Sequence, residues 1–242
     1  MKYTKTMSKI YKKLLVGIGV CAIILGLTGC TNARIQRTIN TLEKKYGETF
    51  TYQGARGGMA ETDGLEIYLV AEDYPDTPFW VRNKWVNGRQ VITDGFMGVK
   101  YREETRTLLQ ETIEEVTEAD VVIGYSGCST AMPEGASGDM TFEEYISLPS
   151  SEIRFYAITG CQCNSEAEQE ELEKKLEEAF VEQGICSIDG RVYFDNGEGH
   201  FEELQNGELI NGQYIISESA SCHIQFEMED TTGFSSVVWK EN

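Results

Sequence analysis

The chain carries, at residues 79–93, the run FWVRNKWVNGRQVIT. Two stretches rich in β-branched and aromatic residues, Phe79–Val86 and Arg89–Thr93, flank the pair Asn87-Gly88. The two central residues of a tight hairpin turn need positive φ, which Asn and Gly adopt most readily. The run therefore predicts an antiparallel hairpin and places the first half of the chain in a β-sheet.

The side chains of the first hairpin strand divide between two faces, because successive residues of a strand point to opposite sides of a sheet. One face is predicted to belong to the core and holds Phe79, Val81, Asn83 and Trp85. The other face joins an aromatic ring to cations, with Arg89 across the turn, and holds Trp80, Arg82 and Lys84. These four are the candidate binding residues, for an anionic partner or a sugar ring. The alternative is a solvated strand face that binds nothing.

The segments around the hairpin predict an α-β-β-β-α unit over residues 33–118. Helices are expected where apolar residues recur every three or four positions, and strands where β-branched and aromatic residues gather. In chain order the patterns predict a helix ending near Gly47, an extended segment Thr49–Gln53, a strand Leu65–Ala71, the hairpin, and a helix Met97–Val116.

The second half mixes helices and strands and ends in short antiparallel strands. Thr141 with Glu144 and Ser165 with Glu168 form the capping-box pattern that starts a helix. The strands are predicted at Val121–Tyr125, Ile153–Thr159, Ile185–Ile188, Arg191–Phe194, Gln213–Glu218, His223–Met228 and Ser235–Lys240, with turns at Asn196-Gly197, Asn206-Gly207 and Asn211-Gly212. The fold class is α+β.

The first 29 residues have the pattern of a secretory signal peptide. Five Lys and no acidic residue precede an apolar run, Leu14–Leu27, which is shorter than the roughly 20 residues of a membrane span. The alternative is a signal anchor that retains this run in the membrane. With a signal peptide at 1–29, the chain divides into an N-terminal subdomain at 30–118 and a C-terminal subdomain at 119–242.

The four residues Leu27-Thr28-Gly29-Cys30 resemble the lipobox of bacterial lipoproteins. The resemblance implies that Cys30 is lipidated, becomes the new N-terminus and holds the protein at the extracytoplasmic face of the cell membrane. In the body, the segments Tyr46–Phe50 and Asp94–Glu104 are similar to uncharacterised lipoproteins of Gram-positive bacteria. That likeness implies no activity and no functional residue.

The charge of the chain excludes nucleic acid as a partner. Residues 30–242 carry 16 Lys and Arg against 40 Asp and Glu. Proteins bind nucleic acid largely through Lys and Arg side chains that displace counterions from its phosphates. This charge also disfavours electrostatic attachment to anionic lipid, so membrane contact is expected through the acyl chains. We interpret the excess of acids as a source of solubility.

Five cysteines remain in the body once Cys21 and Cys30 are set aside: Cys128, Cys161, Cys163, Cys186 and Cys222. All five are disulfide candidates, because an extracytoplasmic compartment permits oxidation. If the strands before Cys128 and Cys161 run parallel and adjacent, a bridge from Cys128 to Cys161 or Cys163 is expected, which leaves Cys186 and Cys222 as the second pair. Connectivity cannot be deduced from spacing. Alternatively, Cys161 and Cys163 form a strained, redox-active pair.

Other chemistry has weak support in the sequence. The two histidines form no zinc-binding pair, and no metal or cofactor is predicted. The acidic loops Asp195–His200 and Glu72–Asp76 leave calcium binding open. Gly124–Cys128 only partly matches a nucleophile elbow around Ser126, so no catalytic residue is predicted.

These patterns favour a non-enzymatic, lipid-anchored binding or interaction module, with a cell-surface protein or glycan as its partner. The alternative function is an extracytoplasmic thiol-disulfide protein that uses Cys161 and Cys163.

Overall fold

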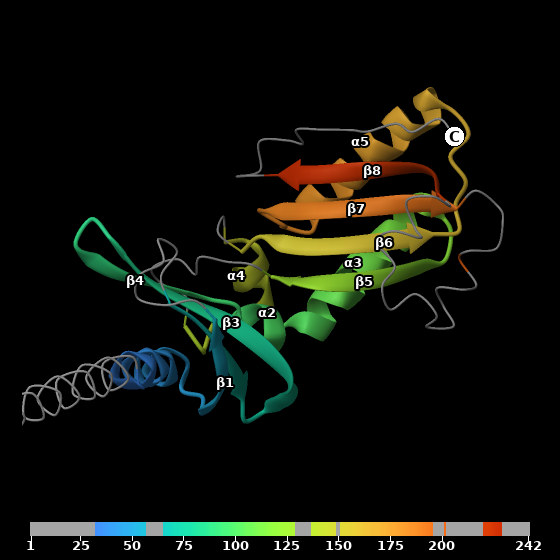
Figure 1. Cartoon of the computed structure of the whole chain (residues 1–242). Helices are drawn as coiled ribbons and strands as arrows, with labels where there is room; N and C mark the ends of the chain where they lie inside the picture. The colour runs from blue at the N-terminus through green and yellow to red at the C-terminus, as the bar shows by residue number, and fades with distance from the viewer. Residues whose placement is uncertain are drawn as a thin grey trace, which may run out of the picture.

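The protein is an α+β fold built on two four-stranded sheets, as the sequence predicted (Figure 1). The computed structural model describes residues 32–56, 65–128, 137–148, 151–195, 201 and 220–228. The predicted strands Gln213–Glu218 and Ser235–Lys240, the three Asn-Gly turns between residues 196 and 212, and the lipidation site Cys30 lie outside the described residues.

The first sheet is antiparallel throughout, in the order β1-β2-β3-β4. A helix over residues 32–46 precedes it, and its strands are β1 (Phe50–Arg56), β2 (Leu65–Ala71), β3 (Tyr74–Val86) and β4 (Arg89–Asp94). The segment predicted as extended pairs with β2 as the edge strand β1. The hairpin prediction is confirmed, since Asn87 and Gly88 have φ of 51° and 77°.

The second sheet has the order β5-β6-β7-β8, with β6 and β7 parallel and the other pairs antiparallel. Its strands are β5 (Val121–Cys128), β6 (Ile153–Thr159), β7 (Ile188–Asp195) and β8 (Ala220–Met228). The helix α5 (Glu166–Glu182) connects the parallel pair, as such a crossover requires. The short helix α4 (Phe142–Ile146) lies between β5 and β6 in the chain.

The helix predicted at Met97–Val116 is two helices, α2 (Phe96–Lys100) and α3 (Arg102–Thr117). The chain leaves helical geometry at Tyr101, whose φ and ψ are −104° and 23°. The Tyr101 ring lies 5.6 and 5.5 Å from the rings of Phe142 and Tyr145, and its hydroxyl donates to the carbonyl of Met140. These contacts with the α4 region accompany the break, which apolar periodicity alone did not reveal.

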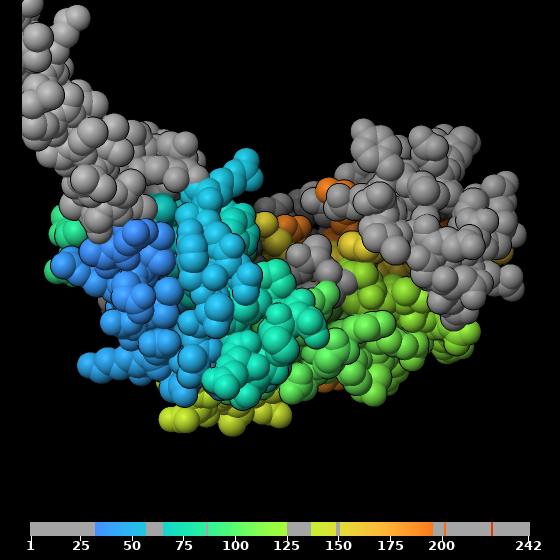
Figure 2. Space-filling model, turned by 60° about the horizontal axis from the view of Figure 1, so that its bottom comes forward, coloured from blue at the N-terminus to red at the C-terminus, as the bar shows by residue number. Residues whose placement is uncertain are grey.

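One hydrophobic core joins the two halves of the chain. Its buried side chains form a single cluster that runs from Ile35 in the first helix to Ile224 in β8. The helix α3 follows the first sheet in the chain but packs against α5 and β5. Figure 2 shows the first helix (blue) and β1 and β2 (cyan) toward one end of the molecule and α3 (green) toward the other.

The prediction of two strands, Ile185–Ile188 and Arg191–Phe194, was wrong: a single strand, β7, begins at Ile188 and runs through Asp189-Gly190 to Asp195, and residues 185–187 lie outside it. Gly190 pairs with Phe155 of β6, and a Cβ at position 190 would lie 2.1 Å from the Phe155 ring. Glycine is present because an aromatic ring occupies the space above its backbone, a recognised role of strand glycines.

The capping-box prediction is confirmed fully at α4 and partly at α5. At α4, Thr141 and Glu144 accept each other's backbone N–H groups. At α5, Ser165 accepts from the Glu168 N–H, but the Glu168 carboxylate accepts from the N–H of Asn164 at 2.8 Å. Both arrangements satisfy N–H groups that a helix N-terminus leaves without an intrahelical partner.

Candidate functional site

The cross-strand register places polar side chains from three strands on one side of the first sheet. Arg56, Glu66 and Arg82 occupy directly paired positions across β1, β2 and β3, and Tyr68 pairs with Trp80 in the neighbouring row. We call these five residues the outer face. Phe79, Val81 and Asn83 alternate to the opposite side of β3 and are buried, so the predicted division into two faces is confirmed for this part of the strand.

Arg82 of the outer face contacts both a carboxylate and an aromatic ring. Its Nε donates to a carboxylate oxygen of Glu66 at 2.8 Å, and its guanidinium carbon lies 5.3 Å from the centroid of the Trp80 ring. Within the described residues, its Nη groups make no hydrogen bond, and 51% of the side chain is exposed. The planar guanidinium is therefore held by a ring and a carboxylate while two of its donor groups face solvent.

Glu66 supports this arrangement in its ionised form. Its second carboxylate oxygen accepts from the Tyr68 hydroxyl at 2.7 Å. That hydrogen bond and the one from Arg82, together with the nearby charge of Arg56, lower the pKa of Glu66 against the opposing effect of partial burial. The same hydrogen bond raises the pKa of Tyr68. One carboxylate thus lies between two arginines and leaves the row with an excess positive charge.

Lys84 and Arg89 lie farther along the hairpin, and both are exposed. Lys84 pairs with Val91, and Arg89 pairs with Val86, so the alternation places both on the side of Arg82. The structure thus brings the four predicted binding residues to one side of the hairpin, with only Arg82 held by Glu66 and Trp80.

Trp85 was predicted to belong to the core, and this was wrong because 67% of the residue is exposed. The last residue of β3 that pairs with β2 is Asn83, opposite Leu65. Beyond that point, none of the described strands other than β4 pairs with β3, and the alternation of side chains continues along these two strands alone.

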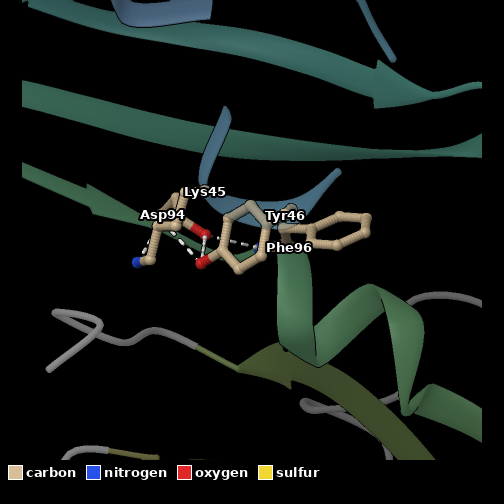
Figure 3. Close-up of polar contacts among 4 residues, drawn as sticks. All are labelled: Lys45, Tyr46, Asp94 and Phe96. Carbon is tan, nitrogen blue, oxygen red and sulfur yellow. Dashed lines mark hydrogen bonds and ion pairs between the residues drawn. The ribbon is translucent and has the colours of Figure 1, made fainter. Parts of the chain in front are cut away.

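A buried polar network lies on the other side of the first sheet (Figure 3). The Tyr46 hydroxyl lies 2.9 and 3.1 Å from the two carboxyl oxygens of Asp94. The Phe96 N–H donates to the same carboxyl at 3.1 Å, and the Lys45 ammonium lies 3.7 Å away. Asp94 is fully buried. Burial raises its pKa, and the contacts with Lys45, Phe96 and Tyr46 oppose that shift.

This network connects the end of the first helix to β4 and to the start of α2. Burial, with the adjacent Asp94, also raises the pKa of Tyr46 far above its usual value, so the tyrosine stays a donor. Sequence reasoning missed Asp94, whose only signal was an acidic residue directly after a strand. Because its carboxyl already accepts from protein groups and is closed to solvent, we assign it a structural role.

The pairing argument for Cys128 was wrong, because β5 and β6 are neighbours but antiparallel. Cys128 lies opposite Ile153, whereas Cys161 follows Thr159, which pairs with Val121 at the other end. The seven residues of β6 separate these ends by six steps along the strand, about 20 Å. Cys128 is therefore far from Cys161 and Cys163.

The second pair predicted by elimination gains no support from the register. Cys222 pairs with Phe194 near the end of β7, whereas Cys186 precedes the first residue of that strand, Ile188. The backbones of Cys186 and Cys222 thus lie toward opposite ends of β7.

The thiols at the start of α5 lack the electrostatic setting of a reactive pair. Cys161 is a partly exposed free thiol, and Cys163 is buried. Burial raises the pKa of Cys161, with further contributions from Cys163 and Glu168. A reactive thiol needs a lowered pKa, so this environment does not favour the thiol-disulfide alternative.

The remaining sequence candidates form no site in the described part of the chain. No group of His, Cys, Asp and Glu there has an arrangement that could hold a metal ion. Glu72 and Asp73 form the short turn between β2 and β3, and the loop after Asp195 lies outside the described residues. Ser126 lies within β5, so it does not occupy the strand-to-helix turn of a nucleophile elbow.

Comparison with known proteins gives no assignment. No family model and no curated protein matches the chain. A crystal structure of a DUF5037 family protein from Ruminococcus gnavus ATCC 29149 is similar over 83% of this chain and 93% of its own, with 14% identity and a TM-score of 0.40. This likeness transfers no residue role. Among the helices in the described ranges, none is both long and apolar enough to span a membrane.

Proposed function

We propose that the chain is an exported lipoprotein, anchored at the extracytoplasmic face of the cell membrane through Cys30, that binds an anionic ligand at the outer face. The leader and the lipobox-like residues support export and anchoring. Anion binding is supported by the Arg82 guanidinium, which Glu66 and Trp80 hold in place with donors facing solvent, and by a second arginine, Arg56, two strands away in the same row.

The arrangement of Arg82 favours an anion over a sugar ring. A sugar would need an open aromatic surface, but the guanidinium lies over the ring of Trp80. A carboxylate or phosphate can instead receive two parallel N–H donors from an arginine that is already oriented. Orientation before binding reduces the ordering cost of association.

The proposal predicts that anionic polymers bind and that Arg82 carries the binding. In isothermal titration calorimetry at low salt, we expect the purified mature protein to bind polyglutamate or polyphosphate and to show no binding of dextran. Replacing Arg56 and Arg82 by Ala should weaken binding at least about tenfold, since loss of about 1.4 kcal/mol corresponds to one decade.

A matched control is provided by Lys174 and Lys175, two exposed cations of α5 with ion-pair partners of their own. Replacing both by Ala removes the same charge. The affinity for the anionic polymer should stay within about twofold of the parent, because salt screens charges that are distant from the outer face. The Arg variants should unfold within about 1 kcal/mol of the parent, because exposed ion pairs contribute little. Equal loss in both variants, or equal binding of dextran, would contradict the assignment.

A further inference from the structure

The tip of the β3–β4 hairpin and the N-terminal end of the first helix lie on the same side of the first sheet's long direction, near the start of the mature chain. At the end of the helix, Tyr46 bonds to Asp94 at the base of β4. About two and three helical turns earlier, Thr38 and Arg34 contact Asn83, which lies nearer to the hairpin turn than Asp94's partner Val81 does. The helix therefore runs from the hairpin tip toward the base, and its first described residue, 32, is two residues from Cys30. In Figure 1 the hairpin projects toward the side where this helix begins.

The hairpin tip, residues 84–90, combines cations with an exposed indole. Lys84 and Arg89 are exposed, and 67% of Trp85 is exposed on the side of the strand that carries the first helix. The whole hairpin, residues 79–93, contains three cations and no acidic residue. Tryptophan is enriched at membrane interfaces, where its ring lies at the level of the headgroups, and the neighbouring cations complement anionic lipid.

The excess negative charge of the chain belongs mainly to the second half of its sequence. Residues 30–118 carry 11 Lys and Arg against 15 Asp and Glu, whereas residues 119–242 carry 5 against 25. The total charge predicted no electrostatic attachment to anionic lipid, but that interpretation treated the charge as evenly spread. Screening confines each charge to roughly 10 Å, so the tip presents its own cations to a nearby surface.

We propose that the hairpin tip docks on anionic phospholipid headgroups beside the lipid of Cys30, with Trp85 at the interface and Lys84 and Arg89 on the phosphates. The proposal rests on the anchoring in the proposed function. The short connection from residue 30 to residue 32 keeps the tip close to the bilayer once the lipid is inserted. A second, weak contact then fixes the orientation of the body, since an acyl anchor alone restrains position but not tilt.

The test follows Trp85 in the lipidated mature protein, reconstituted into vesicles that contain brominated phosphatidylcholine. Trp80→Phe and Trp239→Phe leave Trp85 as the one tryptophan of the chain. We expect strong quenching of its fluorescence when phosphatidylglycerol is included and weak quenching without it. Lys84→Gln with Arg89→Gln should lower the docked-to-free ratio about 30-fold, because each cation near an anionic surface contributes about 1 kcal/mol.

The matched control is Arg106→Gln with Lys174→Gln, which removes the same charge from exposed positions on α3 and α5. It should leave the quenching unchanged. The docking proposal would be overturned by quenching that is the same with and without phosphatidylglycerol, or by quenching that falls equally in both double variants. Failure of the lipid anchor is a separate outcome, because protein without an anchor would not float with the vesicles. Docking of the tip is measured only on the protein that does float.

Discussion

Replacing Asp94 by Ala is expected to lower the free energy of unfolding by about 3 kcal/mol, because two buried donor groups lose their acceptor at once. The variant leaves the Tyr46 hydroxyl and the Phe96 N–H without their acceptor in a closed site, and each unsatisfied buried group costs about 1–3 kcal/mol. Urea unfolding followed by circular dichroism measures the difference. The first helix, which Tyr46 connects to β4, should lose protection from hydrogen exchange first.

Two variants make the Asp94 prediction specific. Asp76 is an exposed acidic residue of β3, and Asp76→Ala should change stability by less than about 0.5 kcal/mol. Asp94→Asn keeps an acceptor for Tyr46 and Phe96, so it should cost clearly less than Asp94→Ala. An Asp94→Ala variant as stable as Asp76→Ala would show that the network contributes nothing.

The pH dependence of the Asp94 contribution has a defined sign. Because burial raises its pKa in the folded protein, the folded state binds this proton more tightly than the unfolded state. Its contribution to stability is therefore full below the unfolded pKa near 3.8 and declines as pH rises through the folded value. Asp94→Asn should remove that decline, so the stability difference between parent and variant should change with pH in this direction.

Gly190→Ala is expected to destabilise the second sheet by about 2 kcal/mol, within the range of overpacked cores. Its Cβ would lie 2.1 Å from the Phe155 ring, which is itself packed against Phe180 with ring centroids 6.1 Å apart. The ring cannot move without disturbing the contact between β6 and α5. Thermal unfolding of the purified variant measures the loss.

Gly54 provides the matched control for Gly190, because it also lies in a strand but a Cβ there would have nothing within 4 Å. Gly54→Ala should be neutral or slightly stabilising, since alanine reduces the entropy of the unfolded chain. Adding Phe155→Leu to Gly190→Ala should recover part of the lost stability by giving the Cβ room. Equal effects of the two glycine variants would refute the steric explanation.

Local signals in the sequence predicted the fold class, most elements and the hairpin turn. The Asn87-Gly88 pair worked because its requirement for positive φ is local. The prediction that β5 and β6 run parallel was wrong, because the alternation of residues along a strand does not tell its direction. The segment that connects the two strands is long enough for a parallel or an antiparallel arrangement. Asp189-Gly190 was predicted as a turn between two strands because the reason for the glycine is not local. The ring that leaves no room for a Cβ at position 190 belongs to Phe155, 35 positions earlier.

The candidate site was predicted only along one strand. Alternation located Trp80, Arg82 and Lys84, but Arg56, Glu66 and Tyr68 come from strands whose register with β3 is a long-range property. The outward positions of β2 were the available signal, since Glu66 and Tyr68 alternate with apolar residues. Trp85 was misplaced because alternation tells which side a residue faces but not where the sheet beneath it ends.

The anchor on which both proposals depend is tested by the intact mass and N-terminal peptide of the protein extracted from membranes of its own cell. We predict a chain that begins at Cys30, with residues 1–29 removed and a diacylglycerol group on the Cys30 sulfur. A chain that retains the leader, with an unmodified thiol at Cys30, would contradict lipid anchoring and remove the basis for membrane docking at the hairpin tip.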